Sequence, residues 1–109
     1  MNNYLIFRTD RIGDFLLTAI LIKSIKRNDP GCYIFLVSSE KNFEYINSFK
    51  NIDKVFFLKK GFINKVKLFF SLNKYSYRSI IVHDSKNRSK IISFFLKSKK
   101  KYIPNNNKL

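Results

Sequence analysis

The sequence has a single cysteine, Cys32, and a single histidine, His83, among its 109 residues. One cysteine excludes an internal disulfide, and a chain without disulfides suits a reducing compartment. One cysteine and one histidine cannot build a Cys/His zinc site, so no metal is expected. Cys32 lies beside an apolar run, and we interpret it as a small core residue and not as a nucleophile.

Long apolar runs are also absent. The longest, "FLLTAILI" and "IISFFL", fall far short of the ~20 residues that a membrane span requires. The opening residues "MNNYLIFRTD" lack the basic region and long apolar region of a secretory signal. We therefore expect a cytoplasmic location.

Neither glycine-rich phosphate motif occurs: the sequence contains no G-x-G-x-x-G and no G-x-x-x-x-G-K-[ST]. A dinucleotide site or a P-loop is therefore poorly supported.

Acidic residues are scarce, since seven Asp and Glu stand against 22 Lys and Arg, and the formal net charge is +15. An excess of this size favours an anionic partner. A biased base composition would give the same pattern, however, because Lys, Asn, Ile and Phe are all abundant together. Apolar residues reach 45% and include twelve Phe, which is enough for the core of one domain.

Short apolar runs alternate with longer ones along the chain. The pattern predicts strands over 4–8, 32–38, 53–59, 78–84 and 99–104, and helices over 13–27, 39–49, 62–74 and 86–97. Such alternation is typical of an α/β fold with a parallel sheet and helices on both faces, and right-handed crossovers favour the strand order 3-2-1-4-5. We expect one Rossmann-like domain over 1–104 and a disordered tail over 105–109. Five phenylalanines in the last two helices are interpreted as core residues: Phe62, Phe69, Phe70, Phe94 and Phe95. If a further domain normally covers part of this surface, some of them would be exposed in the isolated chain.

The stretch "RTDRIGD" carries its charge where the first strand passes to the first helix. In parallel α/β sheets, ligands bind at the carboxyl ends of the strands, next to the point where the strand order reverses. One interpretation makes Asp14 a general base, kept ionised by the helix N-terminus and by Arg8 and Arg11. The other makes Asp14 a helix N-cap and nothing more. Gly13 would let the backbone approach a ligand closely or take a positive φ.

The order of these features resembles glycosyltransferase family 9, the lipopolysaccharide heptosyltransferases and their relatives. That family opens with a short strand, an R-x-D-x-x-G-D loop and an apolar helix, followed by a Pro-containing turn, a second strand and a phrase ending in I-D-x-V. The matching residues here are Arg8, Asp10, Gly13, Asp14, Pro30, Asn51, Ile52, Asp53 and Val55. The stretch from "YSYRSIIVHD" to "KSKKKYI" resembles the family's fourth strand, its "R-S" helix start and its basic fifth strand. One departure is Ala19, where many relatives carry proline.

The resemblance implies the N-terminal, acceptor-binding half of a GT-B glycosyltransferase, in which two Rossmann-like domains face each other across a cleft. Asp14 matches the family's proposed base, which deprotonates an acceptor hydroxyl for an inverting attack on the sugar. The typical donor is ADP-heptose and the typical acceptor is the acidic inner core of lipopolysaccharide, with no required metal or further cofactor. The rest of the loop is implied to bind substrate: Arg8, Thr9, Asp10, Arg11 and Gly13.

Three later residues complete the candidate site. His83 and Asp84 end the fourth predicted strand and would line the acceptor cleft, and Arg88 occupies the "R-S" position, where it would bind acceptor anions. For His83, a structural role is the alternative. A dense basic cluster either contacts phosphates, carboxylates or lipid headgroups, or is a solvated helix end: Lys86, Arg88, Lys90, Lys97, Lys99, Lys100 and Lys101.

Family members run to roughly three hundred residues, a two-domain length, so the resemblance implies that the donor-binding domain is absent from this chain. We expect no useful transfer by the 109 residues alone, because catalysis needs both substrates held together. The expected partners are an anionic glycolipid acceptor, a separate donor-binding domain and the inner face of the cell membrane.

Two other functions stay open. One is a non-catalytic basic module that binds nucleic acid or an anionic membrane surface, which the mixture of lysines and aromatics in "KVKLFFSLNKYSYR" favours. Specific nucleic-acid binding is not expected, because no recognition motif is present. The other is an inactive remnant that merely folds.

Overall fold

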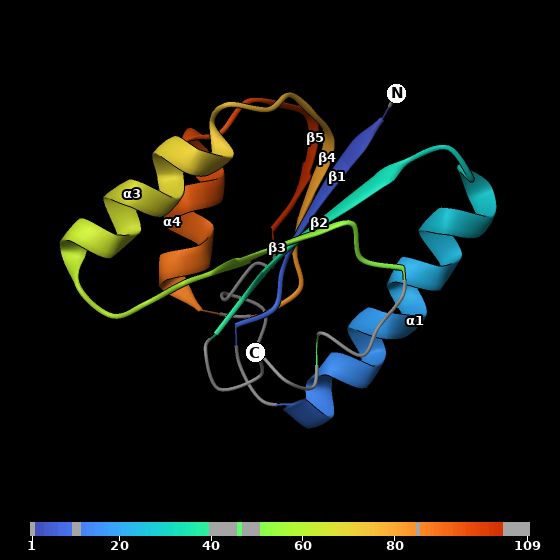
Figure 1. Ribbon diagram of the computed structural model, residues 1–109, viewed down its shortest axis with the longest axis horizontal. Coiled ribbons are helices and arrows are strands. Elements are labelled where there is room, and N and C mark those ends of the chain that lie inside the picture. The colour runs from blue at the N-terminus through green and yellow to red at the C-terminus, as the bar shows by residue number, and fades with distance from the viewer. Residues whose placement is uncertain (1, 10–11, 40–45, 47–50, 85, 104–109) are drawn as a thin grey trace.

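A five-stranded parallel sheet with the strand order β3-β2-β1-β4-β5 forms the centre of the protein (Figure 1). The computed structural model describes residues 2–9, 12–39, 46, 51–84 and 86–103. The strands are β1 (Asn3–Phe7), β2 (Tyr33–Ser38), β3 (Lys54–Phe57), β4 (Tyr77–Val82) and β5 (Ser98–Tyr102). The helices are α1 (Ile12–Asn28), α3 (Phe62–Leu72) and α4 (Asn87–Phe95). The predicted α/β fold and strand order are confirmed.

The central strand β1 is buried on both faces. Leu5, Ile6 and Phe7 are all 0% exposed, because β1 has a strand on each side and a helical layer on each face. In register, Leu5 pairs with Phe35 of β2 and with Ile80 of β4. This strand therefore fixes where the loop that follows it begins.

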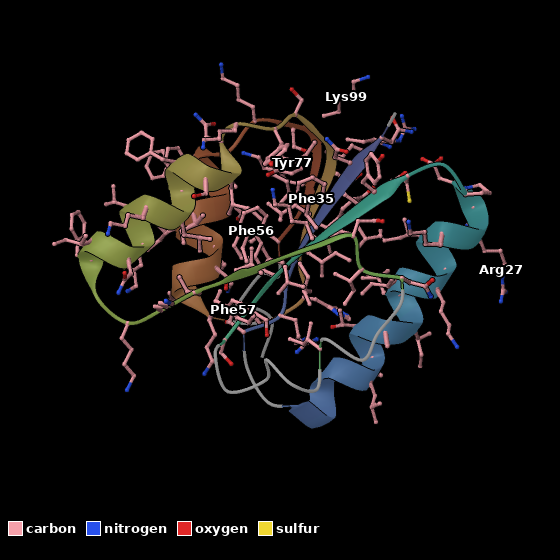
Figure 2. The ribbon with its side chains drawn as sticks, in the orientation of Figure 1. Arg27, Phe35, Phe56, Phe57, Tyr77 and Lys99 are labelled. Atoms are coloured by element: carbon pink, nitrogen blue, oxygen red, sulfur yellow. The ribbon has the colours of Figure 1, made fainter. Side chains whose placement is uncertain are left out.

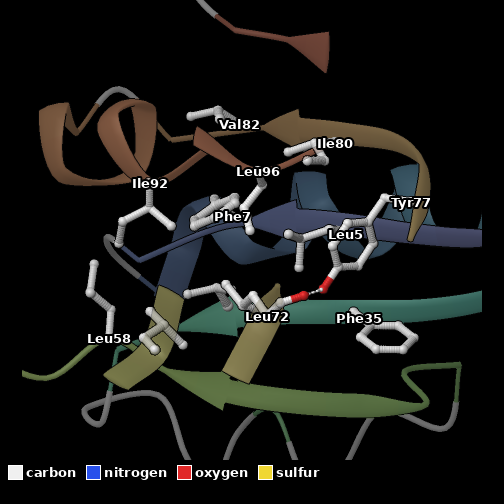
Figure 3. Close-up of a cluster of buried hydrophobic side chains, with 12 residues drawn as sticks. Leu5, Phe7, Phe35, Leu58, Leu72, Tyr77, Ile80, Val82, Ile92 and Leu96 are labelled. Atoms are coloured by element: carbon white, nitrogen blue, oxygen red, sulfur yellow. Dashed lines mark hydrogen bonds between the residues drawn. The ribbon is translucent and has the colours of Figure 1, made fainter. Parts of the chain in front are cut away.

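Two apolar clusters fill the space between the sheet and its helices. Helix α1 covers one face, and α3 and α4 cover the other (Figure 1). The cluster on the α3 and α4 side is drawn in Figure 3 and contains Leu5, Phe7, Phe35, Val37, Leu58, Leu68, Leu72, Tyr77, Ile80, Val82, Ile92 and Leu96. The cluster on the α1 side contains Ile6, Ile22, Cys32, Ile34, Leu36 and Ile46. Successive residues of β1 thus serve opposite layers, as the pleat of a strand requires.

Two polar side chains of the core show how burial sets their chemistry. The Tyr77 hydroxyl donates a hydrogen bond of 2.7 Å to the Leu72 carbonyl, which ties the end of α3 to the start of β4 (Figure 3). Burial raises the pKa of Tyr77, so the donor stays protonated. Burial also raises the pKa of the Cys32 thiol, which is 2% exposed. The interpretation of Cys32 as a core residue is confirmed.

The aspartate of the "I-D-x-V" phrase has a structural role. The Asp53 carboxylate accepts hydrogen bonds from the Ile34 backbone N–H at 2.7 Å and from the Lys26 ammonium at 2.9 Å. Lys26 also donates to the Cys32 carbonyl at 2.8 Å. These contacts join the end of α1 to the start of β2 and the approach to β3.

Four of the five phenylalanines interpreted as core are exposed, so the core interpretation is wrong for these four and the alternative of exposed side chains holds. Their exposed fractions are 80% for Phe62, 61% for Phe70, 68% for Phe94 and 64% for Phe95, whereas Phe69 is partly buried. In α3 the side chains that pack on the sheet are Leu68 and Leu72. Helix α3 carries apolar residues on several sides. The side that faces the sheet is the one on which the two leucines lie, one helical turn apart.

Two predicted segments lie mostly or wholly outside the described residues. Of the helix predicted over 39–49, Ser39 and Ile46 are described: Ser39 is not in a helix, whereas Ile46 is helical and 1% exposed. The tail predicted over 105–109 is not described.

The two faces of α3 predict different costs of truncation. We expect Leu72→Ala to lower the free energy of unfolding by about 2–5 kcal/mol, because it opens a cavity in the core. Phe70→Ala, on the exposed side of the same helix, should change it by no more than about 0.5 kcal/mol. Urea denaturation of both variants measures the difference. Equal losses would contradict the observed orientation of α3.

Candidate functional site

The predicted site lies where β1 and β4 end side by side. The Phe7 carbonyl accepts hydrogen bonds from the backbone N–H groups of His83 at 3.0 Å and Asp84 at 3.2 Å. On the other side, the Arg8 N–H donates to the Val37 carbonyl of β2 at 2.9 Å. The strand order reverses at β1, so this edge is the position at which parallel α/β sheets bind their ligands.

A buried carboxylate holds the two loops at this edge together. Asp84 is 1% exposed, and its Oδ2 accepts hydrogen bonds from the Thr9 N–H at 2.8 Å, the Thr9 hydroxyl at 2.7 Å and the Ser89 hydroxyl at 3.0 Å. Its Oδ1 accepts from the Lys86 N–H at 3.2 Å. A buried carboxylate needs several donors to offset its lost hydration. Asp84 thus joins the start of the β1–α1 loop to the β4–α4 loop and to α4.

A second polar contact lies on the α1 side of the same edge. The Nε of Arg8, a residue 5% exposed, donates to the Thr18 hydroxyl at 2.9 Å. The Thr18 hydroxyl also lies 2.7 Å from Nδ1 of the half-buried His83. If the ring is neutral with Nδ1 unprotonated, Thr18 accepts from Arg8 and donates to His83, and the imidazole proton is on Nε2. Arg8 and His83 are thereby fixed to the second turn of α1.

Adjacent residues of the loop serve opposite layers. Arg8 reaches toward α1, whereas Thr9 reaches toward α4. This alternation continues the pleat of β1 beyond its last ladder residue. The start of the β1–α1 loop is therefore held from both sides of the sheet.

The backbone of Asp14 lies in the first turn of α1, because the helix begins at Ile12. The N-cap position precedes the helix, so the interpretation of Asp14 as an N-cap is wrong. Gly13 also lies within the helix, where φ is negative, so the positive φ that we considered for it does not occur. The side chains of residues 12–15 lie outside the described part of the structure, so the role of the Asp14 carboxylate stays a prediction.

The remaining predicted residues are placed to different extents. Arg88 is the second residue of α4, but its side chain lies outside the described part of the structure, and so do Asp10 and Arg11. Arg8, Thr9 and Asp84 come together with His83 at one edge, as predicted, but the first three are buried side chains that bond to other parts of the protein.

The prediction missed two members of the network, Thr18 and Ser89, both 0% exposed. Thr18 is a lone hydroxyl inside the apolar run "FLLTAILI". A buried hydroxyl requires a hydrogen-bond partner, so a hydroxyl in an apolar run could have indicated that Thr18 bonds to another polar side chain. Ser89 lies in the first turn of α4, five residues after Asp84.

Within the described residues, no group of three or more His, Cys, Asp and Glu side chains is arranged to hold a metal ion. In that same part of the chain, no helix is both long and apolar enough to cross a membrane. Among the side chains that the structure describes, the groups gathered at this edge are hydroxyls, one carboxylate, one guanidinium and one imidazole, which bind through hydrogen bonds and charge.

The contacts of Asp84 predict a large cost for a small change. Asp84→Asn keeps the shape but replaces one acceptor oxygen with a donor and removes the charge, so buried donors lose their partner. We expect the free energy of unfolding to fall by about 2–3 kcal/mol. Ser89→Ala removes one donor and should cost about 1 kcal/mol. Urea denaturation compares them, and an Asp84→Asn loss no larger than that of Ser89→Ala would speak against the network.

Solved structures of glycosyltransferases share this fold. No protein-family model matches the sequence, and no curated protein matches it. A glycosyl transferase family 9 structure from Veillonella parvula DSM 2008 matches 96% of this chain at 17% identity with a TM-score of 0.76. The E. coli heptosyltransferase WaaC matches 90% of this chain at 15% identity with a TM-score of 0.74, both in its structure with ADP and in that with ADP-2-deoxy-2-fluoro heptose.

The match spans only part of each of those proteins, between 34% and 36% of their chains. At this level of identity the likeness establishes the arrangement of the backbone. The fold of this chain is that of about one third of a family 9 glycosyltransferase.

Proposed function

We propose that this chain is the acceptor-binding half of an inverting glycosyltransferase. It would transfer heptose or a related sugar from a nucleotide-sugar to the lipopolysaccharide core or a similar glycan. The fold shared with the family 9 structure and with WaaC supports this proposal. The observation that carries it furthest is the buried network that holds Arg8 and Thr9, the start of the β1–α1 loop, at the carboxyl edge of the sheet.

In this proposal Asp14 is the catalytic base. It lies in the first turn of α1, where the free N–H groups of the helix favour an anionic side chain. A carboxylate held ionised in this way is a weak base that is always available. It suits a reaction in which the acceptor hydroxyl loses its proton late, as the anomeric carbon develops positive charge.

We assign the buried residues of the network a positioning role. Arg8, Thr9 and Asp84 are 5%, 3% and 1% exposed, so they would act on substrate through the loop that they hold. Precise placement of a reacting group accounts for a large part of enzymatic rate enhancement. Contact with the acceptor would fall to the other predicted residues: Asp10, Arg11, Gly13, His83 and Arg88.

The donor belongs to a different part of the proposed enzyme. The chain spans about a third of the glycosyltransferases that it matches, and we propose that a separate domain binds the nucleotide-sugar. This chain without that domain would have no useful turnover, since the two substrates would not be held together. The proposed location is the cytoplasmic side of the cell membrane, in peripheral contact with an anionic glycolipid acceptor.

Substitution of Asp14 tests the proposal in a protein that joins this chain to a donor-binding domain. Asp14→Asn should lower kcat by about two to four orders of magnitude, because it removes the base. Asp10→Asn, a matched loss of charge in the same loop, should act mainly on the acceptor KM. Steady-state kinetics with thermal unfolding as a folding control separates the two effects. A kcat for Asp14→Asn close to that of the parent protein would remove Asp14 from this role.

A further inference from the structure

The positive charge of this protein is concentrated in the second half of its sequence. Residues 54–109 contain fifteen Lys and Arg but a single acidic residue, Asp84, whereas residues 1–53 contain seven Lys and Arg and six Asp and Glu. Asp84 is 1% exposed, so it offsets little of this charge at the surface. A biased base composition would enrich lysine throughout the chain, so it does not account for the contrast between the halves.

The same half exposes large apolar side chains on α3 and α4. On α3 the exposed fractions are 80% for Phe62, 69% for Ile63 and 61% for Phe70. On α4 they are 59% for Ile91, 68% for Phe94 and 64% for Phe95. We call these six residues the α3–α4 patch. Helix α1 also exposes apolar side chains, at 54% for Leu16, 58% for Leu17 and 66% for Ile20, but only those of α3 and α4 lie in the half of the chain that carries the excess positive charge.

The patch lies on the outward side of its two helices. In α3, Ile63 and Phe70 are two helical turns apart and lie opposite the buried Leu68 and Leu72. In α4, Ile91, Phe94 and Phe95 repeat with the spacing of one helical face. Both helices cover the same face of the sheet (Figure 1), so all six side chains belong to the helical layer on that face.

Lysines surround the patch. Near the start of α3, Lys59, Lys60 and Lys67 are exposed beside Phe62 and Ile63. Near α4, the Lys101 ammonium lies 5.9 Å from the centre of the Phe94 ring and donates to the Phe94 carbonyl at 2.9 Å. On the neighbouring strand β5, Lys99 projects away from the body of the protein (Figure 2). The described part of α3, α4 and β5 exposes phenylalanine and lysine but no acidic side chain. Such a surface is complementary to a lipid bilayer, in which an apolar layer lies beneath anionic headgroups.

Charge argues against two other occupants of this face, a second copy of the chain and a nucleic acid. A second copy of the chain would bring two strongly basic surfaces together, which is repulsive. Nucleic acid would satisfy the lysines, but it offers nothing to Ile63 and Ile91, and thirteen of the fifteen basic residues in this half are Lys while two are Arg. Lysine acts as a point charge and lacks the planar fork of arginine. A bilayer with anionic lipids satisfies both the lysines and the aliphatic side chains.

We propose that the α3–α4 patch docks this protein on an anionic lipid bilayer, with Phe62 and Ile63 entering the headgroup region and the flanking lysines binding the lipid phosphates. Phe62 and Ile63 open α3, and only the four residues 58–61 separate them from the carboxyl end of β3. In a parallel sheet this is the same edge as the candidate site, so docking there brings the site close to the membrane surface. The inference deepens the proposed contact with a glycolipid acceptor, but the docking itself requires neither acceptor nor donor.

Vesicle flotation with the full chain tests this docking, because aggregated protein does not float. The vesicles are phosphatidylcholine alone or an equimolar mixture with phosphatidylglycerol, so they contain no glycolipid and no sugar donor. We expect binding to the anionic vesicles only, with loss of binding as salt rises from about 0.05 to 0.5 M. Absence of binding to the anionic vesicles would disprove the docking surface. The transferase proposal would be unaffected, because the kinetics of the Asp14→Asn variant test it separately.

Two matched pairs of substitutions locate the docking surface. Phe62→Ser with Ile63→Ser should weaken binding by about tenfold or more, because the inserted apolar side chains are lost. Leu17→Ser with Ile20→Ser removes side chains that are 58% and 66% exposed on α1, on the opposite face of the sheet, and should leave binding unchanged. All four positions are exposed, so both variants should fold.

Three results would overturn the proposal. One is binding that the Phe62 and Ile63 pair does not weaken, and another is equal binding to neutral vesicles. The third is tighter binding to a single-stranded oligonucleotide than to anionic vesicles, with no effect of the serine pair, since that would make nucleic acid the partner.

Discussion

The buried carboxylate of Asp84 joins two loops that are 75 residues apart in the sequence. It lies at the end of β4 and accepts the Thr9 amide and hydroxyl from the end of β1. Removing a carboxylate from water is costly unless it is well bonded, and four hydrogen bonds reach the oxygens of this one. The start of the β1–α1 loop takes its position from this contact.

The two halves of the sequence contribute differently to the surface. The first half supplies the central strand, the charged loop and α1, with acidic and basic residues nearly balanced. The second half supplies α3, α4 and β5, with nearly all of the excess positive charge and the α3–α4 patch. The candidate site uses residues of both, since Arg8 and Thr9 meet His83 and Asp84 where the two inner strands end. Chemistry at the sheet edge and docking through an outer helical face are therefore compatible in one small domain.

The fold was predictable because it depends on local patterns. Alternating apolar runs and turn residues are visible in the sequence, and the general right-handedness of β-α-β crossovers then favours one strand order. The orientation of α3 was not predictable in the same way, because Phe62 and Phe70 compete with Leu68 and Leu72 as apolar stripes and packing against the sheet decides between them. The network around Asp84 was only partly predictable. The sequence indicated that the site lies at the carboxyl edge of the sheet, but the hydrogen bond between Thr9 and Asp84 depends on tertiary structure.

Amide hydrogen exchange at Thr9 tests the central contact most directly. Thr9 lies beyond the last residue of β1, and an ordinary loop amide there would exchange almost as fast as in an unfolded chain. Because the Thr9 N–H donates to the buried Asp84 carboxylate, we expect its exchange in the full chain to be slowed to a level comparable with Leu5 and Ile6 in the core of β1. Exchange of the Thr9 amide at the rate of an unprotected loop would contradict this account of the site.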